Sequence, residues 1–98
     1  MASKNVGWIY LISNSAVPGL VKVGFTTRRP EDRARELGGT GLPSDYVVEW
    51  SIRVTSPAAA EKAAHEAIKK FHHSKEWFSC SSSEAIERIE SAVSRYSS

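Results

Sequence analysis

The chain has 98 residues and a formal net charge of +2, which is enough for one small domain with a thin core. This mildly basic balance is a weak indication of a polyanionic partner such as nucleic acid. Cys80 is the single cysteine, so an intramolecular disulfide and a cysteine-based zinc site are excluded. No segment has the pattern of a signal peptide or a membrane span, and we expect a cytoplasmic protein with no membrane partner.

The first residues of the domain predict a β-hairpin. Residues 1–6 are polar, and we expect a flexible N-terminus followed by one domain over residues 7–96. β-Branched and aromatic residues over 8–12 predict a strand, and a second strand is predicted over 20–25. The intervening Asn, Ser, Pro and Gly residues are typical of a turn.

A helix and a third strand are predicted next. Pro30 suits the first turn of a helix, and the acidic residues after it favour the positive helix end. The glycines at 38–39 predict where this helix ends. Residues 45–54 alternate between apolar and polar side chains, which is the pattern of a strand.

Two further helices complete the predicted order ββαβαα. Pro57 predicts the start of a helix that lasts to about Phe71 and has an alanine-rich apolar stripe. A short extended piece covers 76–80, and the residues from Ser81 to Glu84 are typical of a capping box that opens the last helix. This order predicts an α+β fold with an antiparallel or mixed sheet and helices packed on it.

Four residues have the chemistry that phosphodiester hydrolysis requires, namely Tyr10, Lys22, Arg33 and Glu61. A tyrosine or lysine can take or guide the proton of an attacking water. An arginine can hold two phosphate oxygens, and a carboxylate suits Mg²⁺. Because side chains alternate along strands, Tyr10 and Lys22 are expected on one sheet face, beside open space at Gly24. We expect all four to line one shallow cleft, on the side of the sheet where the first two helices end.

These residues stand in motifs that resemble the GIY-YIG nuclease superfamily, in particular its small single-domain branch of phages and bacteria. Gly7-Trp8-Ile9-Tyr10 looks like the first half of the family signature, and Lys22-Val23-Gly24 stands where the second half belongs. The resemblance covers about residues 7 to 90. Further segments that are similar to this branch are Pro18 to Val21, Thr26-Thr27, Arg33, Glu36-Leu37, Glu61-Lys62, His65 and Glu76-Trp77-Phe78.

The resemblance implies a small three-stranded antiparallel sheet flanked by helices. It implies that Tyr10 activates or orients the attacking water, that Arg33 stabilises the phosphate, and that Glu61 binds Mg²⁺ or Mn²⁺. Lys22 replaces the tyrosine that usually begins the second motif, and lysine at this position in active relatives is thought to assist the water or bind phosphate.

The asparagine that many relatives carry after the metal-binding helix is absent, because the only asparagines are Asn5 and Asn14. His72 or His73 is a candidate replacement, and His65 is a further accessory candidate.

Four basic residues are candidates for the rim of a phosphate track, namely Arg28, Arg29, Arg35 and Lys75. The plainer interpretation of the arginines is a solvated helix face.

Each site residue also has a structural interpretation. Tyr10 could pack in the core with its hydroxyl at the surface, and Glu61 could form a salt bridge with Arg33. His65 stands four residues after Glu61, where a hydrogen bond within the helix is the simple explanation. Residues 77–78 are most simply core aromatics.

The sequence therefore predicts a metal-dependent endonuclease of the GIY-YIG type, with DNA as the expected nucleic acid and Mg²⁺ or Mn²⁺ as cofactor. The alternative is a non-catalytic nucleic-acid-binding module with the same fold, which Lys22 and the missing asparagine favour. A domain of this size has little surface for sequence specificity, so a homodimer or a protein partner is left open.

Overall fold

The structure is a computed structural model that describes residues 6–38 and 46–97. The elements, in chain order, are β1 (Val6–Asn14), β2 (Leu20–Thr26), α1 (Pro30–Leu37), β3 (Tyr46–Thr55), α2 (Pro57–Ala67), the 3-10 turn η1 (Lys69–Phe71), β4 (His72–Ser74), β5 (Trp77–Ser79), α3 (Ser82–Val93) and the 3-10 turn η2 (Ser94–Tyr96). Residues 1–5, most of the segment expected to be flexible, lie outside the described residues, as do residues 39–45 between the first helix and the third strand.

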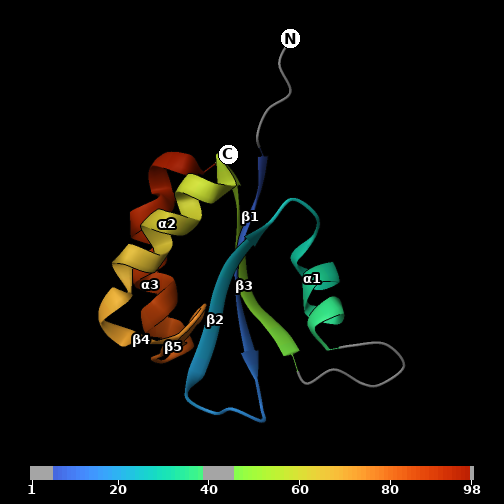
Figure 1. The fold of residues 1–98 in the computed structure, drawn as a ribbon. Coiled ribbons are helices and arrows are strands. Elements are labelled where there is room, and N and C mark those ends of the chain that lie inside the picture. The colour runs from blue at the N-terminus through green and yellow to red at the C-terminus, as the bar shows by residue number, and fades with distance from the viewer. Residues whose placement is uncertain (1–5, 39–45, 98) are drawn as a thin grey trace.

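The strands form one five-stranded antiparallel sheet in the order β3-β1-β2-β5-β4 (Figure 1). The prediction of a three-stranded sheet with the element order ββαβαα is therefore wrong. The two additional strands, β4 and β5, form a hairpin of three residues each beside β2. A strand of three residues is too short to display an alternating pattern, and His72–Ser74 contains no β-branched residue.

The two faces of the sheet pack against different helices (Figure 1). One face carries the main core, in which strand residues such as Ile9, Leu11 and Val23 pack against α2 and α3. The other face carries a smaller cluster, in which Tyr10 and Ile12 pack against Ala34 of α1. The helices α1 and α2 thus lie on opposite faces of the sheet.

The helix boundaries follow the local sequence signals. Pro30 and Pro57 stand in the first turns of α1 and α2, and Gly38 caps α1 as predicted. The hydroxyl oxygen of Ser81 accepts a hydrogen bond of 3.2 Å from the amide of Glu84, which confirms the capping interaction at the start of α3. The second helix ends earlier than predicted, at Ala67, and continues as the turn η1.

The hairpin of β1 and β2 sets Tyr10 directly opposite Gly24 and Ile12 opposite Lys22. The space beside Gly24, which was expected to be open, is filled by the phenol ring of Tyr10. A β-carbon at position 24 would lie 2.5 Å from the Tyr10 hydroxyl oxygen and 3.1 Å from a carboxylate oxygen of Glu76. Gly24 therefore lets the tyrosine lie flat across β2.

We expect Gly24→Ala to destabilise the fold by about 1–3 kcal/mol, because the added methyl group overlaps the Tyr10 ring. Chemical denaturation of the variant and the wild type measures this loss. In a Tyr10→Ala background, which removes the overlapping ring, the same substitution should cost much less. An equal cost in both backgrounds would show that the ring is not the reason for the glycine.

Candidate active site

Tyr10 is buried, with 1% of its surface exposed, and its hydroxyl lies within hydrogen-bonding range of the Arg33 guanidinium. Burial is the largest influence on the Tyr10 hydroxyl and raises its pKa, while the Arg33 hydrogen bond acts in the opposite direction and the charge of Glu76 adds to the rise. The phenol is therefore protonated at neutral pH. In this state it can orient a water molecule but cannot take a proton from one.

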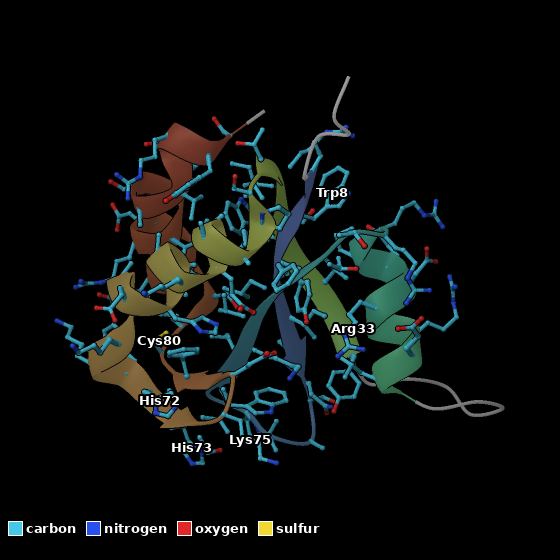
Figure 2. All side chains as sticks on the ribbon, turned by 45° about the horizontal axis from the view of Figure 1, so that its top comes forward. Trp8, Arg33, His72, His73, Lys75 and Cys80 are labelled. Carbon is cyan, nitrogen blue, oxygen red and sulfur yellow. The ribbon has the colours of Figure 1, made fainter. Side chains whose placement is uncertain are left out.

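Arg33 lies in α1 and points toward the sheet (Figure 2). The Tyr10 hydrogen bond is the main cause that raises the pKa of the guanidinium, which stays charged. Its Nη1 lies 3.5 Å from a carboxylate oxygen of Glu36, and 40% of its side chain remains exposed. Arg33 is thus anchored on the phenol and has exposed surface for a phosphate.

Lys22 forms an ion pair with Glu76, with 3.2 Å between Nζ and Oε1. Only 13% of the lysine side chain is exposed, so this pair lies in a partly desolvated position. The residue before Glu76, Lys75, has a left-handed φ of 50°, which is a strained conformation for a non-glycine residue in the turn between β4 and β5.

Glu61 is the carboxylate that the sequence singled out in α2, and it is partly buried. Burial is the main cause that raises its pKa, and the nearby charge of Glu76 raises it further. The charge of His65, a hydrogen bond from the amide of Phe25 and the charge of Lys22 act in the opposite direction. In the described ranges no basic side chain lies within ion-pair distance of Glu61.

The proposed salt bridge between Glu61 and Arg33 is thus wrong, since the arginine pairs with Glu36. The expected hydrogen bond between His65 and Glu61 is also wrong. His65 instead donates from Nε2 to the carbonyl oxygen of Val23 over 2.8 Å, and its ring lies 5.1 Å from that of Phe78.

These side chains come together around the outer edge of β2. Strand β5 pairs with β2 only as far as Lys22, and the Val23 amide then donates to the carbonyl oxygen of Glu76 over 3.0 Å. Beyond that point the side chains of His65 and Glu61 reach from α2 to the backbone of β2. Tyr10 and Glu61 approach this edge from opposite faces, near enough for the charge of Glu61 to affect the pKa of Tyr10. The expectation of a cleft on one side of the sheet is therefore wrong, although the four residues do converge.

The structure adds Glu76 to this group, and the sequence analysis did not name it as a site residue. Its charge affects both Tyr10 and Glu61, and it pairs directly with Lys22. The signal that could have found it is the resemblance of Glu76-Trp77-Phe78, which marked the segment but not the carboxylate.

The basic residues of the predicted phosphate track are exposed but mostly paired. Arg28 forms an ion pair with Glu36, and Arg29 and Arg35 both pair with Asp32, at 3.5 Å and 3.1 Å. These contacts cancel much of the positive charge of α1.

Lys75 lies with His72 and His73 at the β4–β5 hairpin, which forms the edge of the sheet opposite β3 and is well separated from Arg33 in Figure 2. Nε2 of His72 donates to the carbonyl oxygen of Lys75 over 2.9 Å, and the ring packs edge-on against Phe78. Among the described residues, no hydrogen bond or ion pair joins His72 or His73 to Glu61.

Over the parts of the chain that the structure describes, no group of three His, Cys, Asp or Glu side chains is close enough to hold a metal ion. No helix within these ranges is long and apolar enough to cross a membrane.

Comparison with known families gives one match, in which the T5orf172 domain covers residues 7–94. The chain belongs to the T5orf172 domain family. This finding corrects the assignment to the GIY-YIG superfamily, which rested on the order and spacing of short motifs over about residues 7 to 90 and is wrong. T5orf172 is a nucleic-acid-related domain, which is consistent with a role in binding or cutting nucleic acid. No curated protein and no solved structure matches the chain.

We expect Glu76→Gln to lower the pKa of Glu61, because the negative charge of Glu76 is one of the causes that raise it. An NMR titration of the Glu61 carboxyl carbon in both proteins measures the shift. The matched control is Glu66→Gln, which changes an exposed carboxylate of α2 that pairs with Lys69. An unchanged or raised pKa in the Glu76 variant would contradict the proximity of the two carboxylates.

Proposed function

We propose that this T5orf172 domain is a metal-dependent endonuclease that hydrolyses phosphodiester bonds, with DNA as its substrate. The observation that carries the proposal is Glu61, a partly buried carboxylate that forms no ion pair with any described residue and lies close enough to Lys22 for that charge to lower its pKa. A buried carboxylate is costly unless a cation or hydrogen bonds compensate it, and its raised pKa indicates that the compensation here is incomplete. The nucleic-acid-related family supports the substrate class.

Mg²⁺ or Mn²⁺ fits the oxygen donors of this edge, because these hard cations bind carboxylates and keep several waters. Glu61 would hold the ion, and the nearby negative charge of Glu76 would add to the attraction for the cation. Such an ion, when bound, would neutralise charge that develops on the phosphate and the leaving oxygen. A site in which one protein carboxylate holds the ion and waters supply the other ligands does not require a cluster of three protein ligands.

The side chains of the site would bind the phosphate, orient the attacking water and accept its proton, each according to its charge and protonation state. Arg33, with its exposed guanidinium, binds phosphate oxygens, and Lys22 adds a second positive charge. The protonated Tyr10 orients the attacking water. Since Tyr10 cannot accept a proton, we assign this role to the Glu76 carboxylate beside it. The water oxygen bonds to phosphorus, its proton moves to Glu76, and the bond to the leaving sugar oxygen breaks. That oxygen takes a proton from solvent, so the products are a phosphomonoester end and a hydroxyl end.

The second candidate function is a nucleic-acid-binding module without catalysis. The lack of a three-ligand metal cluster among the described residues is the observation that favours it. The variants below separate the two functions, because they affect cleavage and binding differently.

We expect Glu61→Ala to abolish metal-dependent nicking of supercoiled DNA while leaving DNA binding largely intact, since a metal ligand acts mainly as charge develops in the transition state. Arg33→Ala should instead reduce both the rate and the affinity, by about 1–3 kcal/mol, because a phosphate contact acts in both states. Nicking assays with Mn²⁺, Mg²⁺ and chelator, together with binding in chelator, measure these effects.

The matched controls are Glu66→Ala on the exposed side of α2 and Arg88→Ala in α3, which pairs with Glu84 and lies outside the phosphate track; both should retain nicking. Equal nicking by wild type and Glu61→Ala would overturn the proposal. Retained binding without nicking by either protein would favour the non-catalytic module.

The phosphate track leads to a prediction about salt. DNA binding should weaken steeply with ionic strength, and each phosphate contact that is lost should reduce the logarithmic salt slope by about 1. Lys75→Ala should lower the slope most clearly, because Arg28, Arg29 and Arg35 are already paired with acidic neighbours. Fluorescence anisotropy at several salt concentrations measures the slopes, and binding that does not depend on salt would contradict the track.

A further inference from the structure

The sheet face that carries Tyr10 is covered by a helix over only part of its width. Helix α1 packs against β3 and β1, and α2 and α3 pack on the opposite face (Figure 1). In the described part of the chain, no helix packs on this face over β5 and the adjoining end of β2. Side chains of the uncovered strip therefore face outward.

Trp77 lies on this uncovered strip. It pairs with Lys22 across β2 and β5, so both side chains lie on one face, while the next residue, Phe78, turns into the core with 1% of its surface exposed. Trp77 is partly exposed and belongs to neither hydrophobic cluster. Its assignment as a core aromatic is therefore wrong.

The neighbours of Trp77 are another aromatic ring and a cation. The Lys22 ammonium lies 5.6 Å from the centre of the indole ring, and the Tyr46 ring lies 6.4 Å away at an angle of 38°. Aromatic rings on an open sheet surface, next to positive charge, are the features on which proteins stack nucleobases.

A base in a double helix has both flat faces covered by its neighbours, so only an unpaired base can stack on such a ring. Lys22 belongs both to this strip and to the group around Tyr10 and Glu76. A strand whose phosphate reaches Lys22 and Arg33 therefore brings an adjacent base within reach of Trp77.

We propose that Trp77, with Tyr46 beside it, stacks an unpaired base next to the phosphate held by Lys22 and Arg33, so that the substrate is single-stranded or contains unpaired bases at the cleaved bond. This inference rests on the proposed function for the position of the phosphate. It specifies the substrate class, which neither the family nor the charge pattern assigns.

Equilibrium binding in chelator tests the stacking without any cleavage. The probes are a fluorescein-labelled oligothymidylate of about 12 nucleotides, the duplex of the same length, and an abasic strand with the same number of phosphates. The wild type should bind the intact strand more tightly than the other two. Trp77→Leu should lose about tenfold in affinity for the intact strand only, and Trp77→Phe, which keeps a ring, should retain most of it.

Trp8→Leu is the matched control, because Trp8 is a partly exposed tryptophan on the same face at the far end of β1. It should leave all three affinities unchanged. Equal wild-type affinity for intact and abasic strands would overturn the proposal without any variant, and so would an equal loss of strand and duplex binding by a folded Trp77→Leu protein. Because no metal is present, these outcomes are independent of whether the protein cleaves DNA.

Discussion

The outer edge of β2 changes its partner part-way along the strand, and the arrangement of the site depends on that change. Up to Lys22 this edge is paired with β5. Beyond it, the Val23 amide donates to the carbonyl oxygen of Glu76, and the Val23 carbonyl oxygen accepts from His65. The Phe25 amide donates to the Glu61 carboxylate. A buried or partly buried strand edge must satisfy its polar groups, and here side chains of α2 do so. Because the Phe25 amide holds the Glu61 carboxylate at this edge, the carboxylate stays close to Lys22 and Glu76 without forming an ion pair to any described residue.

The same edge is reached by side chains from both faces of the sheet. Tyr10 reaches it from the side of α1 because Gly24 leaves room for the phenol ring, and Glu61 reaches it from the side of α2. The burial that positions Tyr10 also raises the pKa of its hydroxyl. The phenol therefore stays protonated and cannot serve as the base. In the proposed reaction the protonated phenol orients the water, and a neighbouring carboxylate is therefore needed to accept its proton.

Sequence patterns predicted the long elements and the residues whose direction follows from periodicity. Tyr10 and Lys22 share a face because their strands alternate, and Glu61 borders the apolar stripe of α2, as the helical repeat indicated. The β4–β5 hairpin could not be predicted, because three residues contain too little pattern, and with it Glu76 and the exposure of Trp77 were missed. Periodicity also does not state which face of a sheet a helix covers, so the opposite positions of α1 and α2 were not foreseen. The ion pairs of Arg28, Arg29 and Arg35 depend on side-chain conformations, which a sequence does not specify.

Lys22 lies between the two parts of the proposed substrate site, the group around Tyr10 and Glu76 and the aromatic ring of Trp77. Its ammonium contacts the Glu76 carboxylate on one side and lies over the Trp77 ring on the other, while little of the side chain is exposed. A lysine held in this way has lost most of its conformational freedom before any ligand arrives, so binding a phosphate costs little additional ordering. In the proposed site Trp77 supplies the aromatic surface and Lys22 supplies the positive charge.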